Sequence, residues 1–469
     1  MSVRAIVGIL LAALSGSAQS LGTFSLTGSM ITSRFSHTAT LLPDGKVLIA
    51  GSYITSTGGH FGSDGYFACQ PGDPCVRATD SELYGPATRT FSRAGSMNMI
   101  QPTGGVLLST GKVLFAESYP TGALAKIVVY DPASGEFKDA GTTATLGYVA
   151  SAALLNDGRV LLLGAGQAEI YDPIAESFSP VPNFRTSLSS VTALAVLLDG
   201  RVLLVPDLPA LFNPADATLT QIPFPFWFDD NPSGTLLPDG KVLLAGGVND
   251  AGTVNSAELF DGSLSMTGSM TSSRFGHSAN LLPNGSVLVA GGVSTASAEI
   301  YDPVAGGFSL TGSMAMPRYY HGSVLLNNGQ VLITGGMDGS FVATSSAELY
   351  TPATLISAPA LFSISRDGQN QGAIWHAATG QIASPDNPAS PGEALSMYTV
   401  NLLPGGLIPP RVVIGGGFGE ILYFGPAPGY PGYYQVNFRL PSGVAPGSAI
   451  PVRLTYLGRP SNAVSIGAQ

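Results

Sequence analysis

Charged residues are scarce in this chain of 469 residues: they make up 11% of it, against roughly 25% of an average soluble protein. The chain has 20 Lys and Arg against 30 Asp and Glu, which gives a formal net charge of −10. A surface with so few cations is poorly suited to nucleic acid or to an anionic membrane. We therefore expect neither of these as a main partner.

Long hydrophobic runs are missing after the N-terminus, so no membrane span is expected. The apolar run Ala5–Leu14 is too short to cross a bilayer. It follows Arg4 and precedes small residues that end near Ser20. This pattern predicts a secretory signal over residues 1–20 and an exported protein, either secreted or held at the cell surface.

Cysteine is nearly absent, since Cys69 and Cys75 are the only two in the chain, and both lie in an insertion, Ser52–Thr79. In an exported protein a disulfide between them is the favoured prediction. A metal pair is the poorer alternative, because His60 is the only further potential ligand nearby. The chain also lacks a Ser-His-Asp arrangement, a phosphate loop and a zinc-binding spacing. The sequence therefore favours a non-enzyme and predicts no cofactor.

Glycine and proline, at 60 and 35 residues, are abundant and mark out a repeat. In the copy Arg274–Met314, two apolar runs flank Asn284-Gly285, a strong hairpin signal. A third strand ends at Pro303, because proline cannot donate to a sheet, and a fourth run follows. Each copy predicts a four-stranded antiparallel blade.

Seven such copies predict an all-β fold that begins with a seven-bladed β-propeller over residues 21–353. The sequence FSLTGSM occurs at both Phe24–Met30 and Phe308–Met314, so residues 24–27 are predicted to supply the fourth strand that copy seven lacks. One aromatic residue of the third strand marks each copy: Tyr84, Tyr130, Tyr171, Phe212, Phe260, Tyr301 and Tyr350.

The diglycine after the second strand, the arginine before the first and the Tyr-Asp-Pro after the third resemble the kelch repeat. The match runs from Arg34 to Pro352 and is weaker in copies two to four, which lack the diglycine. The resemblance implies a kelch-like propeller of the galactose-oxidase-like central-domain superfamily.

The repeat stops after Pro352, and residues 354–359 are predicted to be a linker. From 360 to 469, short apolar strands between Pro and Gly clusters predict an Ig-like β-sandwich. The sequences NPASPGEALSMY and ILYFGPAPGYPGYYQVNFRLPSGVAPG resemble an Ig-like domain common at the C-termini of exported acidobacterial proteins. This resemblance implies a fold and export, not an activity.

Function is expected on the propeller face that carries the variable second-to-third-strand loops. An R-x-x-H pattern precedes the first strand in copies one, six and seven, which become neighbours in a closed ring. We expect these pairs to form a patch for an anionic or polyhydroxylated ligand; alternatively, they only mark the best-preserved repeats. Trp227, in the run Phe224–Phe228, either stacks on a sugar or plugs a gap between blades. The predicted binding residues are Arg34, His37, Arg274, His277, Arg318, Tyr320, His321 and Trp227.

A glutamate stands two residues before the third-strand aromatic in five copies. Because it recurs, we interpret it as structural, bonded to a neighbouring blade, rather than as part of a carboxylate ring. The five are Glu82, Glu169, Glu258, Glu299 and Glu348.

Tyr320-His321, before an inner strand of such a propeller, resembles the copper radical oxidases, galactose oxidase and its relatives. In that family the matching Tyr and His bind copper. A second Tyr, cross-linked to a Cys, and a His from the C-terminal domain complete the site. The second Tyr has no match, since the equivalent positions hold Ser36 and Gly276, and no motif surrounds His376, the only C-terminal His.

The main functional prediction is therefore an exported, non-catalytic protein whose propeller loops bind a glycan or another protein. The alternative is a copper-dependent radical oxidase of the galactose oxidase type. The sequence leaves the oligomeric state open.

Overall fold

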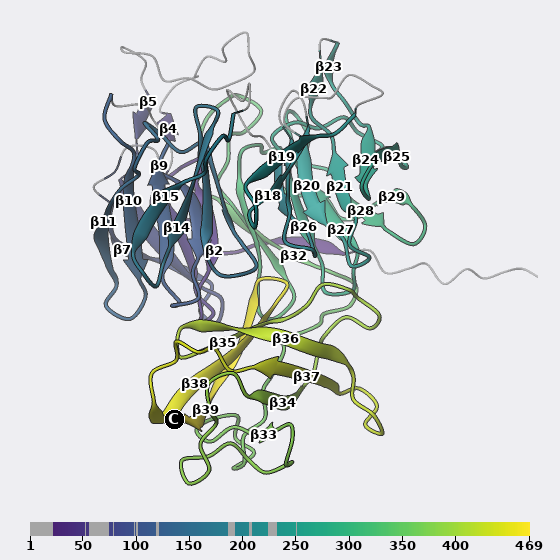
Figure 1. The fold of residues 1–469 in the computed structure, drawn as a ribbon. Coiled ribbons are helices and arrows are strands. Elements are labelled where there is room, and N and C mark those ends of the chain that lie inside the picture. The colour runs from purple at the N-terminus through teal and green to yellow at the C-terminus, as the bar shows by residue number, and fades with distance from the viewer. Residues whose placement is uncertain are drawn as a thin grey trace, which may run out of the picture.

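The computed structural model describes residues 22–51, 53–55, 75–77, 79–97, 99, 102–118, 122–185, 193–205, 209–223, 232–249 and 251–469. These residues form a ring of seven four-stranded sheets and, below it, a smaller curled sheet (Figure 1). No helix in this part of the chain is long and apolar enough to span a membrane. The all-β class predicted from the sequence, a seven-bladed propeller followed by a sandwich, is confirmed.

Each blade is an antiparallel meander, because short apolar runs alternate with tight turns. The first strands of neighbouring blades contact one another and so line the central channel. Blades one to three consist of β2 (Thr38–Leu41), β3 (Val47–Ala50), β6 (Asp80–Gly85) and β7 (Thr90–Ser96); β8 (Pro102–Leu107), β9 (Val113–Glu117), β10 (Lys126–Asp131) and β11 (Glu136–Thr142); and β12 (Ser151–Leu154), β13 (Val160–Gly164), β14 (Gln167–Asp172) and β15 (Ser177–Pro180).

Two blades carry an added short hairpin between their second and third strands: β4 (Tyr53–Thr55) with β5 (Cys75–Arg77) in blade one, and β22 (Val248–Asn249) with β23 (Gly252–Thr253) in blade five. Blades four to six consist of β16 (Ala193–Val196), β17 (Val202–Val205), β18 (Ala210–Asn213) and β19 (Thr218–Gln221); β20 (Ser233–Leu236), β21 (Val242–Ala245), β24 (Ala257–Phe260) and β25 (Leu264–Met266); and β26 (Ser278–Leu281), β27 (Val287–Ala290), β28 (Ala298–Asp302) and β29 (Gly307–Leu310).

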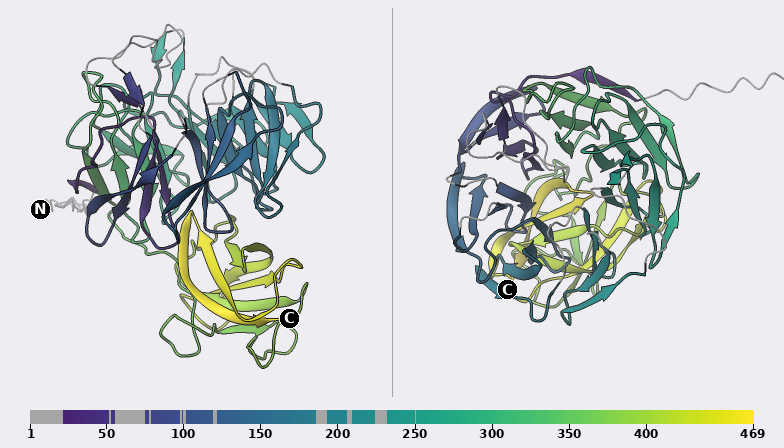
Figure 2. Two further views of the ribbon diagram at one scale, coloured as in Figure 1. Left: turned by 90° about the vertical axis from the view of Figure 1, so that its left-hand side faces the viewer. Right: turned by 90° about the horizontal axis from the view of Figure 1, so that it is seen from above.

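Blade seven joins the two ends of the ring. Its first three strands are β30 (Gly322–Leu325), β31 (Val331–Thr334) and β32 (Ala347–Thr351), and its outer strand is β1 (Thr23–Leu26). Phe24 of β1 lies opposite Tyr350 of β32, and the two strands run antiparallel. The view from above in Figure 2 shows the closed ring. Closure thus pairs the outer edge of β32.

The repeated aromatics join the blades. Tyr301 packs against Phe308 of its own blade, with ring centroids 4.9 Å apart, and its hydroxyl bonds Thr267 Oγ1 in the preceding blade at 2.9 Å. Tyr84 and Tyr350 make the same two contacts in their blades. Between these joints the second strands are buried along their whole length, as in β27. The core is therefore a series of apolar layers between adjacent blades.

The C-terminal part is one antiparallel sheet of seven strands in the order β33-β34-β37-β36-β35-β38-β39. It curls because β36 pairs with β35 at Gly417–Gly419 and then with β37 from Glu420 onward, so that it belongs to both halves. The strands are β33 (Ile374–His376), β34 (Ala394–Thr399), β35 (Arg411–Ile414), β36 (Gly417–Pro426), β37 (Tyr434–Arg439), β38 (Gly447–Tyr456) and β39 (Arg459–Ala468).

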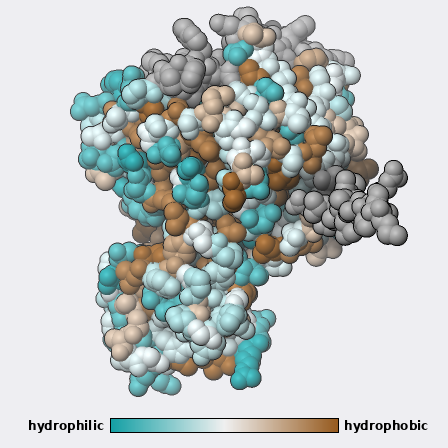
Figure 3. Space-filling view, turned by 90° about the vertical axis from the view of Figure 1, so that its right-hand side faces the viewer, coloured by the Kyte–Doolittle hydropathy of each residue, from teal (hydrophilic) through white to brown (hydrophobic). Residues whose placement is uncertain are grey.

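The C-terminal domain packs on the propeller face that carries the Asx-Gly turns. Carbonyl oxygens next to three of these turns accept hydrogen bonds from it: Pro43 O from Arg453 at 2.8 Å, Pro238 O from Leu407 at 2.7 Å and Asn327 O from Ala358 at 2.6 Å. The hairpin β38–β39 reaches up to the ring (Figure 2, left). Apolar residues gather along the junction between the two parts (Figure 3). The opposite propeller face therefore carries the accessible end of the channel.

Candidate functional site

The three arginines of the R-x-x-H pattern are fully buried, with no exposed surface. Each guanidinium pairs with the third-strand glutamate of its own blade: Arg34–Glu82 at 2.9 Å, Arg274–Glu299 at 2.5 Å and Arg318–Glu348 at 2.8 Å. The arginines are thus inaccessible to solvent and stabilise the blades. This differs from the expected contact with a ligand. The glutamates are structural, but their partner lies in the same blade and not, as predicted, in a neighbouring one.

The three histidines of the pattern, by contrast, meet in one cavity of about 400 Å³ on the accessible face. We call it the mouth cavity. Its lining comes from the segments that lead into the first strands of blades five, six, seven and one: Ser36, His37, Pro232, Ser233, Phe275, Gly276, His277, Tyr320 and His321.

Each histidine connects its blade to the preceding one through a side-chain hydroxyl. The Nε2 atoms bond Thr334, Ser233 and Ser278: His37–Thr334 at 2.8 Å, His277–Ser233 at 2.9 Å and His321–Ser278 at 2.8 Å. The three Nδ1 atoms are buried and have no hydrogen-bond partner among the described residues. The imidazole rings therefore pack between adjacent blades as wedges, and one edge of each imidazole faces the mouth cavity.

Burial keeps these histidines neutral. Burial first, and the neighbouring Arg274 and Arg318 second, lower the pKa of His277 and of His321 respectively to about 3. The pKa of His37 is held well below its usual 6.5 by burial first and by Arg34 second. At neutral pH the mouth cavity thus presents uncharged imidazoles, which hydrogen-bond without attracting anions.

Tyr320 breaks the symmetry of the three copies. Its counterparts are Ser36 and Gly276, and all three residues have a left-handed backbone, with φ of 51°, 52° and 63° respectively. A bulky residue rarely adopts this conformation, and such strain is concentrated at functional sites. The Tyr320 ring packs edge-on against Phe275, 5.5 Å between centroids, and stays partly exposed in the cavity. Tyr320 is therefore the strongest single candidate for a functional residue.

The copper ligand set implied by the resemblance to radical oxidases does not fit. Tyr320 and His321 adjoin, but Nε2 of His321 is engaged with Ser278. His376 lies in β33 of the other domain, where Nδ1 bonds Glu393 at 2.6 Å and Nε2 bonds the Asn387 carbonyl at 3.0 Å. No group of three or more His, Cys, Asp or Glu among the described residues is arranged to hold a metal. We derive no step through copper.

Several predicted features lie outside the described residues. Trp227 with its aromatic run is among them, as are Cys69 and the N-terminal segment 1–20. The disulfide between Cys69 and Cys75, the sugar-stacking role of Trp227 and the secretory signal therefore stay predictions.

Sequence reasoning missed Pro232 and Ser233, which complete the mouth cavity from blade five. Copy five has no R-x-x-H pattern, so nothing in that copy marked them. The available signal was indirect. Once it is known that each histidine bonds the preceding blade, His277 of blade six predicts a partner at the start of copy five.

No protein-family model matches the chain, and no curated protein matches its sequence. Among solved structures, the chain is similar to a fungal alcohol oxidase of the AA5 family that was solved in complex with copper. The similarity covers 96% of this chain and 100% of that one, at a TM-score of 0.60 and 16% identity. The fold is therefore shared across both the propeller and the C-terminal domain.

This comparison contradicts the main functional prediction, a non-catalytic protein that binds a glycan or another protein. The solved protein with the same two-part architecture is an enzyme, which favours the alternative prediction, an oxidase. At 16% identity the similarity shows the fold alone.

Proposed function

We propose that this protein is an enzyme that oxidises a small neutral alcohol bound in the mouth cavity to the carbonyl compound, with dioxygen as the oxidant that takes up two electrons and two protons and leaves as hydrogen peroxide. The observation that carries the proposal is Tyr320, a partly exposed tyrosine in a left-handed backbone that lines the mouth cavity where its counterparts are Ser36 and Gly276. The shared architecture with an alcohol oxidase supports the reaction class. The proposal concerns the substrate class and its place, and it includes no metal-bound step.

The lining of the mouth cavity selects for a neutral substrate. None of its described residues is Asp, Glu, Lys or Arg, and its histidines are neutral. The hydroxyls of Ser36 and Tyr320 can exchange hydrogen bonds with a substrate hydroxyl. The rings of Phe275 and Tyr320 offer apolar surface to its carbon atoms. A cavity of this kind disfavours ions, because they would lose hydration without gaining a counter-charge.

The experiment is an oxidation assay with a panel of small primary alcohols. Oxygen uptake and hydrogen peroxide release are measured, on protein purified with and without added copper. Tyr320→Phe removes the phenol oxygen and keeps the ring. We expect it to lower turnover by about 100-fold, the usual cost of one hydrogen-bonding group in a reaction site. The matched control is Tyr398→Phe, a partly exposed tyrosine of the C-terminal domain, with no expected effect.

The proposal fails if no alcohol is oxidised under either copper condition, or if Tyr320→Phe retains wild-type turnover. Copper analysis of the same samples gives an independent result. Stoichiometric copper in active protein would contradict the finding that the described residues do not fit a copper site.

We also propose that the protein is exported and that its blades are of the kelch type. The Arg4–Ser20 pattern supports export, and the diglycines of blades five, six and seven support the repeat class. N-terminal sequencing of protein from the culture medium and from the cell envelope tests export. A mature chain that still begins at Met1 would contradict it.

A further inference from the structure

A second cavity, of about 360 Å³, lies at the other end of the channel. We call it the channel-floor cavity. The inner strands of blades one, two, three and seven form its upper wall, and β35, β36 and the β38–β39 hairpin form its lower wall. Its lining consists of Ala39, Thr40, Leu41, Gly105, Val106, Leu107, Leu108, Ser109, Leu154, Val324, Arg411, Val413, Phe418, Thr455 and Gly458.

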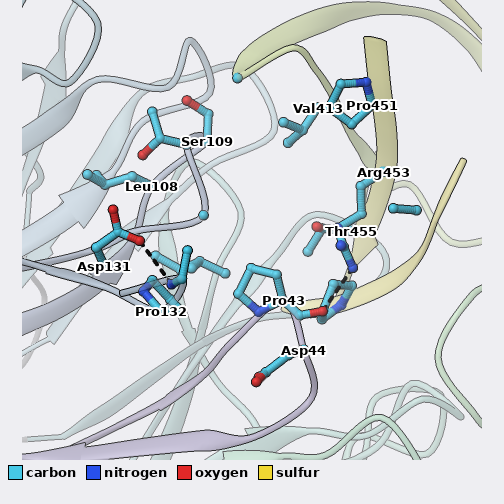
Figure 4. A pocket seen from close by; sticks show the side chains of 17 residues that line it. Pro43, Asp44, Leu108, Ser109, Asp131, Pro132, Val413, Pro451, Arg453 and Thr455 are labelled. Atoms are coloured by element: carbon cyan, nitrogen blue, oxygen red, sulfur yellow. Dashed lines mark hydrogen bonds between the residues drawn. The ribbon is translucent and has the colours of Figure 1, made fainter. Parts of the chain in front are cut away.

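The walls of this cavity are mostly aliphatic or aromatic, as with Leu41, Val324 and Phe418. Among the described lining residues, Arg411 is the one that carries a charge, and none is acidic. The cavity beside it differs. Figure 4 shows that Asp44, Asp131 and Arg453 share the neighbouring cavity, so positive and negative charges are both present there.

Arg411 has no counter-charge in the part of the chain that the structure describes. Its polar contact is one long hydrogen bond, 3.5 Å from Nη2 to the Leu154 carbonyl, and its guanidinium lies 5.9 Å from the Phe418 ring centre. Burial alone lowers its pKa, and no carboxylate offsets that effect. Buried Arg274 and Arg318, in contrast, each pair with a glutamate. A largely buried cation loses hydration, and a carboxylate ligand in the cavity would supply the negative charge that its surroundings lack.

We propose that the channel-floor cavity binds a small organic acid with an apolar body, its carboxylate held by Arg411. The planar guanidinium can donate two parallel hydrogen bonds to a carboxylate. The aliphatic walls accommodate the hydrocarbon part, in the usual arrangement of an apolar pocket with few polar groups. This site lies at the opposite end of the channel from Tyr320 and does not depend on the proposed oxidase activity.

Isothermal titration calorimetry of the full chain with octanoate tests the proposal, and octanamide serves as the neutral ligand of matched shape. We expect one octanoate per chain, bound at least about tenfold more tightly than octanamide, because a charge-assisted pair is worth about a factor of ten or more. Arg411→Gln should lower octanoate affinity about tenfold and leave octanamide unchanged. The control is Arg439→Gln, an exposed arginine that pairs with Glu420 on the outer surface.

Absence of octanoate binding by the wild-type protein, or equal affinity in Arg411→Gln, would overturn the proposal and leave Arg411 as a tie between blade three and the C-terminal domain. If Arg411→Gln does not fold, Arg411→Lys keeps the charge and loses the planar donor. It should then bind octanoate more weakly than wild type but still more tightly than octanamide.

Discussion

At the scale of single residues, the repeat is held by buried charges that satisfy one another. Glu299 accepts hydrogen bonds from the backbone N–H groups of Thr271 and Ser272 as well as from Arg274. The carboxylate thus fixes the loop that enters its blade and neutralises the arginine beneath it. Charges of this kind are tolerated because each has an opposite charge as its partner.

Glu299→Gln tests this role. It leaves Arg274 buried without a counter-charge, and breaking a buried pair from one side costs about 3 kcal/mol or more. We expect the free energy of unfolding in urea to fall by that amount. The matched change is Glu420→Gln, which removes an exposed pair with Arg439 and should cost at most about 1 kcal/mol. Equal losses in the two variants would show that the buried pair contributes no more than a surface one.

The histidine wedges predict a pH dependence of stability. Between about pH 6.5 and pH 3 the unfolded chain protonates His277 and His321, whereas the folded chain keeps them neutral. The unfolded state therefore binds more protons, and stability falls as the pH falls through this window. We expect the urea midpoint of His321→Gln to fall less than that of wild type between pH 7 and pH 4. A variant that tracks the wild-type curve would mean that the pKa of His321 is the same in the folded and the unfolded chain.

At the scale of elements, ring closure depends on β1. This strand of four residues covers the outer edge of β32 and sets Phe24 against Tyr350, 4.9 Å between ring centroids. Because blade seven has no other fourth strand among the described residues, the edge of β32 would otherwise be unpaired. An unpaired edge is a site for association between chains.

A chain that starts at Gly28 removes β1 and tests closure. We expect a lower melting temperature and a shift to larger species in size-exclusion chromatography, because β32 then pairs with other chains. The control chain starts at Gly22 and keeps the strand. Addition of a peptide of residues 22–30 should restore the elution volume of the control chain. Unchanged melting and elution of the shorter chain would show that closure does not need β1.

At the scale of the whole molecule, the C-terminal domain is joined to the propeller through polar contacts at several blades and through the segment between them. The predicted linker is held in place: Arg459 donates to the Ile356 carbonyl at 2.6 Å, and Ala358 donates to the Asn327 carbonyl at the same distance. The channel floor is thus part of the domain junction. Contacts this widely spread favour unfolding of both parts together.

Scanning calorimetry tests that coupling. We expect one transition for the full chain. Arg459→Gln removes a fully buried guanidinium and its bond to the linker, so it should lower the transition temperature by several degrees or split the transition into two. Two well-separated transitions in the wild-type protein would show that the domains are energetically independent.

The blades could be predicted because their signals are local. Asn284-Gly285 fixes a hairpin with its own backbone, and Tyr301 marks a strand by its distance from that turn. The roles of the arginines and histidines could not be predicted, because their partners lie elsewhere in the chain. Arg34 forms an ion pair with Glu82. His37 hydrogen-bonds Thr334 where blade one meets blade seven in the closed ring. The R-x-x-H pattern looks the same in the sequence whether its side chains form a solvent-facing patch or buried contacts within and between blades.

The sequence by itself determined the number of blades, their turns and the second all-β domain, because each of these follows from short-range periodicity and turn chemistry. Only the tertiary structure decided which polar residues are consumed inside the molecule and which reach a cavity. Packing within blade six buries Arg274 against Glu299, ring closure brings Tyr320 to the mouth, and the domain junction sets Arg411 under the channel with no counter-charge among the described residues. Burial and pairing are properties of packed neighbours, and no local pattern in the chain specifies them.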